Sequence, residues 1–248
     1  MIFITGDCHG DFRKFSAQSF AAGRKLDKSD YVIVCGDFGG IWDRSAEEEY
    51  WLKWLADKNF TLLWVDGNHE NYDLLKEYPV ARWKGGEVQY IRPNLIHLMR
   101  GQLYTIEGMT FFTFGGARSH DIIDGILEPD DPMLRLKRKA LEGAGACYRI
   151  NHVSWWEEEM PSGAEMELGR ERLAEAEWKC DFIITHCAPS SIQNCLFSGR
   201  YAQDPLTEYL EEIKRKCAYK RWYFGHYHSD GPIDVKHTLL YNKIEKIC

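Results

Sequence analysis

Three short apolar runs in the first quarter of the chain each stop at a cluster of polar side chains, and this pattern constrains the fold most. The runs at 1–5, 31–35 and 60–65 are followed by GDCHGD, GDFGG and DGNHE. Helix signals separate them, one from Asp11 to Gly23 and one opened by a capping box of Ser45 with Glu48. Strands alternating with helices predict a parallel α/β sheet. The carboxyl ends of such strands, where these polar clusters fall, form the ligand crevice.

The second half of the chain predicts more strand than helix. Strands are predicted at 95–98, 102–107, 109–114, 181–185 and 221–224, and the last two run into His186 and GHYH. Helices are predicted after Ser162, which is paired with Glu165, and after Asp204, with a hairpin or a pair of strands at 235–247. The irregular stretch 117–161 predicts a loop-rich insertion or lid within one domain spanning 1–248.

Composition and charge exclude several classes of protein. The chain is 44% hydrophobic and 28% charged, which is typical of a globular protein. A net charge of −7 disfavours non-specific binding to nucleic acid, although a basic cluster lies at 135–139. The chain opens directly on a strand pattern and has no apolar run long enough to cross a bilayer, so we expect a cytoplasmic protein without a membrane partner. Its eight cysteines are then expected to be free thiols.

Oxygen- and nitrogen-bearing side chains gather just past the predicted strands. The candidate metal ligands are Asp7, His9, Asp37, Asn68, His186, His226 and His228. Alternation along an extended chain predicts that Asp7 and His9 point one way and Cys8 the other, and it likewise pairs His226 with His228. Carboxylate, imidazole and amide groups suit Mn²⁺, Fe²⁺, Zn²⁺ or Ni²⁺. Because this set exceeds what one ion takes, we expect two ions that share a bridging carboxylate.

The order GD-x-H, GD, GNHE, an isolated histidine after a strand, and GH-x-H resembles the calcineurin-like metallophosphoesterase superfamily, in its bacterial or phage-type members. The resemblance implies a four-layer α/β/β/α sandwich with mixed sheets. It implies that one ion is held by Asp7, His9, Asp37 and His228, and the other by Asp37, Asn68, His186 and His226. Asp37 and a water or hydroxide would bridge the ions, and that hydroxide would be the nucleophile. His69 would face the substrate as the catalytic group, protonating the leaving oxygen or stabilising charge on the phosphoryl group.

The sequence also departs from the pattern of many protein phosphatases in that superfamily. They carry GDxxDRG and an arginine directly after GNHE, whereas this chain reads GDFGGIWDR and GNHEN. This difference argues against a phosphoprotein substrate and leaves Arg44, Arg118, Arg149 and Arg200 as candidate replacements for the missing arginines.

Further residues receive predictions with alternatives. We expect Arg118, His120 and Asp121 to line the substrate cleft, with a solvated loop as the alternative. Asp43 or Asp66 is a candidate to orient His69, although Asp66 could equally end its strand and Asp43 precede a helix. The Trp155–Trp156 pair is expected to anchor the helix that follows it to the core, rather than stack on a base or cover the cleft. We expect His97, His152 and His237 to be structural.

The leading hypothesis is a dinuclear metal-dependent phosphoesterase that hydrolyses a phosphomonoester or phosphodiester. Its partner would be a small phosphorylated substrate or a phosphoprotein. A nuclease acting on DNA or RNA is the first alternative, because it uses the same metals and the basic run at 135–139 could bind phosphates. The second alternative is a non-catalytic scaffold that retains the fold, which would be expected to lack some of the ligand positions that are all filled here.

Overall fold

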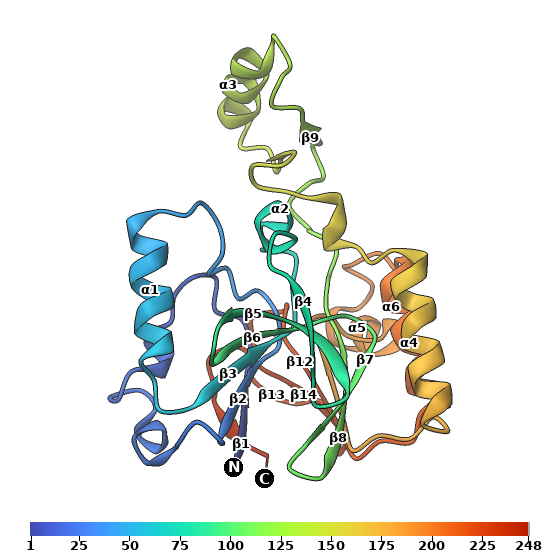
Figure 1. The fold of residues 1–248 in the computed structure, drawn as a ribbon. Coiled ribbons are helices and arrows are strands. Elements are labelled where there is room, and N and C mark those ends of the chain that lie inside the picture. The colour runs from blue at the N-terminus through green and yellow to red at the C-terminus, as the bar shows by residue number, and fades with distance from the viewer. Residues whose placement is uncertain (248) are drawn as a thin grey trace.

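The computed structural model describes residues 1–247 and contains two mixed sheets packed face to face (Figure 1). The first sheet has the strand order β15-β1-β2-β3-β6-β5-β4. Its strands are β1 (Ile2–Thr5), β2 (Tyr31–Val34), β3 (Thr61–Trp64), β4 (Val80–Trp83), β5 (Gly86–Arg92), β6 (Leu95–Leu98) and β15 (Glu245–Lys246). Within it, β1, β2, β3 and β6 run parallel, whereas the pairs β15–β1, β6–β5 and β5–β4 are antiparallel.

The second sheet has the strand order β13-β14-β12-β11-β8-β7. Its strands are β7 (Gln102–Ile106), β8 (Met109–Phe114), β11 (Phe182–Thr185), β12 (Arg221–Phe224), β13 (Gly231–Pro232) and β14 (His237–Leu239). Here β8, β11, β12 and β14 run parallel. Residues 235–247 therefore form two strands and not a hairpin, because β14 belongs to the second sheet and β15 to the first.

Helices cover the outer face of each sheet. They are α1 (Ala46–Ala56), α2 (Tyr72–Leu75), α4 (Gly163–Glu175), α5 (Ser190–Phe197) and α6 (Pro205–Lys216), with 3₁₀ turns at Arg13–Phe15, Ala21–Lys25 and Glu157–Glu159. In Figure 1, α1 lies beside the first sheet, and α4 and α6 lie beside the second.

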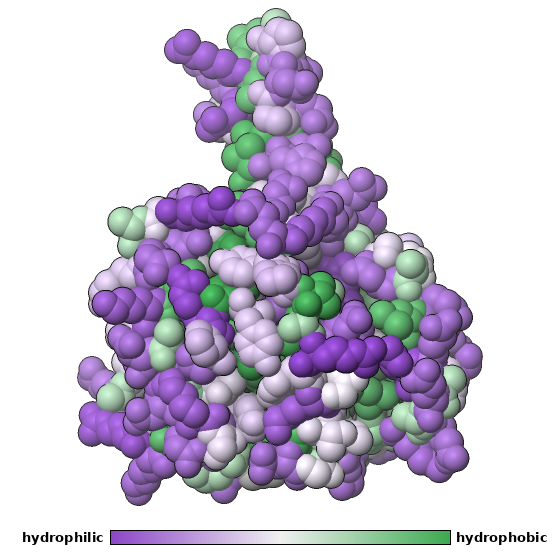
Figure 2. All heavy atoms as spheres, in the orientation of Figure 1, coloured by the Kyte–Doolittle hydropathy of each residue, from purple (hydrophilic) through white to green (hydrophobic). Residues whose placement is uncertain are grey.

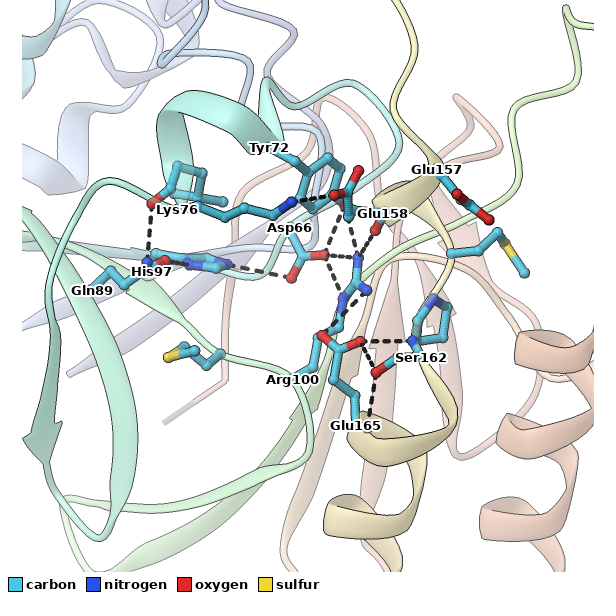
Figure 3. A pocket seen from close by; sticks show the side chains of 14 residues that line it. Asp66, Tyr72, Lys76, Gln89, His97, Arg100, Glu157, Glu158, Ser162 and Glu165 are labelled. Carbon is cyan, nitrogen blue, oxygen red and sulfur yellow. Dashed lines mark hydrogen bonds and ion pairs between the residues drawn. The ribbon is translucent and has the colours of Figure 1, made fainter. Parts of the chain in front are cut away.

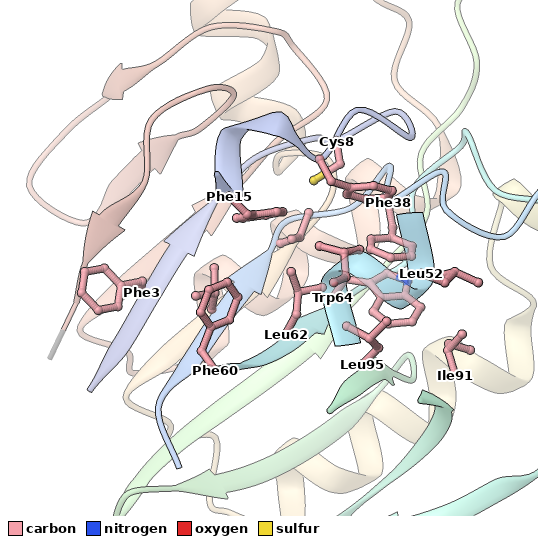
Figure 4. Packing of buried hydrophobic residues seen from close by; sticks show 14 of the residues in the cluster. Phe3, Cys8, Phe15, Phe38, Leu52, Phe60, Leu62, Trp64, Ile91 and Leu95 are labelled. Atoms are coloured by element: carbon pink, nitrogen blue, oxygen red, sulfur yellow. The ribbon is translucent and has the colours of Figure 1, made fainter. Parts of the chain in front are cut away.

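Successive side chains of each strand are buried on opposite faces of its sheet. The result is three apolar clusters, one between each two adjacent layers of the four-layer fold. On β1, Ile2 and Ile4 point into the cluster between the sheets, whereas Phe3 points to the cluster under α1 (Figure 4). On β11, Phe182 and Ile184 likewise face the first sheet, and Ile183 joins the cluster under α4 and α6. The expected α/β/β/α sandwich with mixed sheets is confirmed.

A projecting arm, residues 121–151, rises from the edge of the fold at the carboxyl ends of the strands (Figure 1). It contains β9 (Ile126–Leu127), α3 (Leu134–Ala144) and β10 (Arg149–Ile150), and β9 pairs in parallel with β10. No residue of α3 is buried. Hydrophobic and hydrophilic side chains share its surface (Figure 2). The arm lies within the stretch 117–161 for which the sequence predicts an insertion.

Local structure corrects two expectations and confirms two others. The predicted helix from Asp11 to Gly23 is wrong, since only short 3₁₀ turns form there. Ser45 caps α1 by accepting the Glu48 N–H, but the box is not reciprocal, because the Glu48 carboxylate accepts the N–H groups of 42–44. Ser162 and Glu165 form the full capping box that their spacing predicts. Of the Trp155–Trp156 pair, Trp156 is buried as expected and its indole N–H donates to Asp73, whereas Trp155 is only half-buried.

No helix within residues 1–247 has the length and apolar character needed to span a membrane. The cysteines among these residues are free thiols, as expected; Cys248 lies outside the described residues.

Candidate metal centre

The carboxyl ends of the parallel strands of both sheets meet at one cavity. Its volume is about 230 Å³, and its lining consists of Asp37, Asn68, His69, His120, Asp121, His226 and His228. These residues follow β2, β3, β8 and β12, which lie far apart in the sequence. The remaining candidates Asp7, His9 and His186 contact this lining directly.

One group of side chains can hold a metal ion on the side of β1. Each of Asp7, His9, Asp37 and His228 offers a ligand atom, and these atoms lie within 4.8 Å of one another. The Nε2 atoms of His9 and His228 are 3.0 Å apart, and His228 Nε2 is 3.4 Å from Asp7 Oδ2. This set is the one that the resemblance implies for the first ion.

A second group gathers around the other carboxylate oxygen of Asp37. His186 Nε2 lies 3.2 Å from Asp37 Oδ1 and 3.2 Å from Asn68 Oδ1. His186 Nδ1 is 2.7 Å from the carbonyl oxygen of Cys35, so the proton of the neutral ring belongs on Nδ1 and Nε2 presents its lone pair to the group. The rings of His186 and His226 have centroids 5.0 Å apart. Asp37 therefore lies between two sets of donors.

The buried carboxylates of this site favour the binding of cations. Asp7 and Asp37 are buried, and within residues 1–247 neither forms an ion pair with lysine or arginine. Burial alone would raise the pKa of each carboxyl, but contacts with His228 and His9 at Asp7, and with His186 at Asp37, hold both pKa values well below the usual range. Burial likewise favours neutral His186, yet the charge of Asp37 raises the pKa of His186 to about 10. Two buried anions surrounded by imidazole and amide donors fit divalent transition-metal ions.

Glycines precede several of these residues because the ligand side chains pass close to the backbone. A Cβ on Gly67 would lie 2.0 Å from Asp37 Oδ1, and one on Gly225 would lie 2.1 Å from Asp7 Oδ1. No side chain fits at such distances. The repeated glycine before an aspartate, asparagine or histidine therefore gives the site its compactness.

The local backbone differs from the extended chain that the sequence predicts after β1 and β12. His9, His226 and His228 have φ angles of 50°, 71° and 50°, in the left-handed region that non-glycine residues seldom adopt. Cys8 is buried in the core below α1, as expected. The side chains of Cys8 and His9 point in different directions because of the left-handed turn at His9, and not because of strand alternation. His226 and His228 do not point to one place, since His228 joins Asp7 and His226 faces His120.

His69 is anchored through its backbone. Its N–H donates to Asp37 Oδ1 at 2.7 Å, and its ring packs edge-on against His9, with centroids 5.0 Å apart. Burial lowers the pKa of His69, although the nearby charge of Asp37 opposes that effect.

Neither carboxylate proposed to orient His69 binds its ring. Asp43 is exposed and accepts the Ser45 N–H. Asp66 is buried and pairs with Arg100, with Arg100 Nε 2.7 Å from Asp66 Oδ2. The Tyr72 hydroxyl donates to Asp66 Oδ2 at 2.9 Å and lies 2.5 Å from the Gly67 carbonyl. This network forms the floor of a separate pocket of about 450 Å³ (Figure 3). Asp66 therefore supports the turn that carries Asn68 and His69, instead of touching the His69 ring.

The four candidate arginines differ in whether they lie beside the cavity. Arg149 donates from Nε at 2.8 Å to Oδ2 of Asp121, which lines the cavity, so Arg149 stands beside the cavity. Arg200 lies over the Tyr201 ring, 5.6 Å from its centroid, beside His120. Arg118 is exposed and is not part of the cavity lining, and Arg44 pairs with Glu77 away from the site.

A buried brace behind Asn68 has no local sequence signal. Asn68 Nδ2 donates to Ser119 Oγ at 3.2 Å, and the carboxylate of Glu159 accepts the Ser119 N–H at 2.8 Å and its hydroxyl at 2.5 Å. Burial raises the pKa of Glu159 to about 7, although its bonds to Ser119 oppose that rise. The residues that pair in this brace are 40 or more positions apart in the sequence, so residue spacing could not predict it.

Comparison with known proteins agrees with this arrangement. The family model described as calcineurin-like phosphoesterase matches residues 1–230. No curated protein matches the chain significantly. Because the match covers strands β1 to β12 and every candidate ligand, the chain belongs to the calcineurin-like phosphoesterase family.

Proposed function

We propose that this protein is a dinuclear metal-dependent phosphoesterase that hydrolyses a small phosphomonoester or phosphodiester. The proposal rests chiefly on one observation, the place of Asp37 between two sets of donors. Its Oδ2 lies 3.7 Å from His9 Nδ1, and its Oδ1 lies 3.2 Å from His186 Nε2. A single carboxylate facing ligands on both sides is what a bridged pair of ions requires.

The residues divide into three roles in this proposal. Asp7, His9, Asp37 and His228 hold one divalent ion, and Asp37, Asn68, His186 and His226 hold the other. When bound, such a pair of ions neutralises phosphoryl charge and supplies a nucleophile near neutral pH. His69 faces the cavity and transfers a proton to the leaving oxygen, or donates a hydrogen bond to the phosphoryl group.

The lining of the cavity supports a compact substrate. At about 230 Å³ the cavity holds a phosphoryl group with a small leaving group, and Asp121 closes one side through its pairing with Arg149. Arg149, whose charge acts on His69, and Arg118 and Arg200, whose charges act on His120, are the candidates to bind substrate phosphate oxygens. His120 and Asp121 both line the cavity, and Asp121 is the candidate among them to face the substrate.

The direct test is turnover by the purified protein loaded with Mn²⁺ or Zn²⁺, measured against aryl phosphates and bis-aryl phosphodiesters. We expect hydrolysis of at least one class, and we expect Asp37→Asn to abolish it because both ions lose a ligand. His152→Ala is the matched control, since that residue pairs with Asp73 and is absent from the cavity lining. Full metal occupancy without hydrolysis of either class would remove the proposal.

A nuclease is a second candidate because of one observation, the exposed basic side chains of α3 on the projecting arm. They are Arg135, Lys137, Arg138 and Lys139. If these residues bind nucleic acid, affinity for single- or double-stranded oligonucleotides falls steeply with salt, and charge removal on α3 abolishes that dependence. Turnover of small esters that is unaffected by the same charge removal would favour the small-substrate proposal.

A further inference from the structure

His120 lies at the candidate metal centre, although the sequence pattern of the family does not include a histidine at this position. It lies just beyond β8, where the chain leaves the second sheet for the projecting arm. Its Nε2 atom is 2.8 Å from Nε2 of His226, and both rings line the cavity. Two imidazole nitrogens that approach so closely either share one proton or share one cation.

The spacing matches that of two ligands on one ion. Metal–nitrogen bonds of about 2.0–2.1 Å at right angles place the two ligand atoms about 3 Å apart. The other close contacts of the site have this length: 3.0 Å between His9 Nε2 and His228 Nε2, and 3.2 Å from His186 Nε2 to Asp37 Oδ1 and to Asn68 Oδ1. The His120–His226 pair therefore repeats on the second side of Asp37 what His9 and His228 show on the first.

The His120 ring is held in this direction by aromatic packing. It stacks on Tyr201 with centroids 4.0 Å apart and an interplanar angle of 22°. Tyr201 in turn packs edge-on against Phe197, with centroids 5.0 Å apart. Although His120 is exposed, the segment 197–201 thus fixes the aim of the ring that the insertion supplies.

We propose that His120 is an additional ligand of the second metal ion, alongside Asp37, Asn68, His186 and His226. This inference rests on the proposed two-ion function. It gives the projecting arm a role in the site, because the residue that starts the arm, Asp121, directly follows a metal ligand. Tyr201 is then a positioning residue that acts through His120.

The experiment titrates the full chain, stripped with a chelator, with Co²⁺ and Mn²⁺ and compares four proteins: wild type, His120→Ala, Tyr201→Ala and the control His152→Ala. Calorimetry gives the number of sites and their affinities, and the visible absorption of the Co²⁺ protein reports coordination number and geometry. Thermal unfolding of the metal-free proteins establishes that each variant is folded.

We expect two equivalents in the wild type and in His152→Ala. In His120→Ala one site stays unchanged, the other weakens by about tenfold or more, and the Co²⁺ absorption changes. Tyr201→Ala weakens the same site by a smaller factor. Two equivalents with wild-type affinities and an unchanged spectrum in His120→Ala overturn this inference alone. A wild type that binds fewer than two equivalents overturns the two-ion proposal and this inference with it.

Discussion

The backbone N–H of His69 donates to Oδ1 of Asp37 at 2.7 Å. The carboxylate that lies between the two sets of metal donors thus also fixes the turn carrying the proposed catalytic histidine. Because Asp37 Oδ1 is also 3.2 Å from His186 Nε2, its position depends on both sheets. The binding of metal and the placement of His69 are consequently coupled through one side chain.

Replacement of His69 tests proton donation to the leaving group. For His69→Ala we expect kcat to fall by about 10²–10⁴-fold with bound metal unchanged, since the residue contributes no proposed ligand atom. The loss should be larger for phenyl phosphate than for 4-nitrophenyl phosphate, whose leaving group needs less protonation. Steady-state kinetics with both esters, together with metal analysis, measures this difference. Equal losses for the two esters would contradict a proton-donating role.

Gly67→Ala tests the close approach between β3 and Asp37. The added Cβ meets Asp37 Oδ1 at 2.0 Å, so the turn must shift; we expect a loss of about 1–3 kcal/mol in the free energy of unfolding and weaker metal binding. Gly143→Ala is the matched control, because a Cβ in that exposed part of α3 meets nothing within 4 Å. Urea unfolding of both variants decides the matter. Equal stability of the two variants would show that the approach is not as close as described.

The buried pair of Asp66 and Arg100 predicts a non-additive double mutant. Arg100→Met leaves the Asp66 carboxylate buried without its cation, so we expect a loss of about 3–5 kcal/mol in the free energy of unfolding. Adding Asp66→Asn removes the unpaired charge and should restore a large part of that loss. Chemical denaturation of the two single mutants and the double mutant measures the coupling. A double mutant that loses the sum of the two single losses would exclude it.

Glu159 predicts a specific dependence of stability on pH. Its side chain is only 1% exposed, and burial raises its pKa from 4.5 to about 7, so the folded state holds the proton more tightly than the unfolded state. Its contribution to stability is therefore complete below about pH 4.5 and is lost as pH rises to about 7, by about 3 kcal/mol at most.

The matched measurement compares wild type with Glu159→Gln between pH 5 and 8 in chelator, where metal loading does not vary. Relative to the wild type, the variant should gain stability as pH rises. A difference in unfolding free energy that stays constant over this range would show that Glu159 titrates normally.

The sequence predicts best those features whose causes are local. Short apolar strands and their carboxyl ends are visible because each run ends at its own glycine and polar group, as at Gly36-Asp37 and Gly67-Asn68. The capping box of Ser162 and Glu165 spans only four residues. The predicted helix from Asp11 fails because the buried rings of Phe12, Phe15 and Phe20 bind the segment to the core, and the Ser19 N–H donates to Ser16 Oγ.

Contacts between distant segments could not be predicted in this way. Asp66 and Arg100 are separated by 34 residues, and His120 and His226 by 106, with no periodicity joining them. The sequence placed His120 near the cleft only as a residue beyond a strand end. Its approach to His226 depends on the packing of Tyr201, which three-dimensional structure alone reveals.

The most direct test of the two-ion centre is anomalous diffraction from crystals grown with Mn²⁺. We expect two manganese peaks about 3.5–4 Å apart, with the carboxylate of Asp37 between them and Asn68 and His186 on one side. A single peak beside Asp37, or none, would contradict the account.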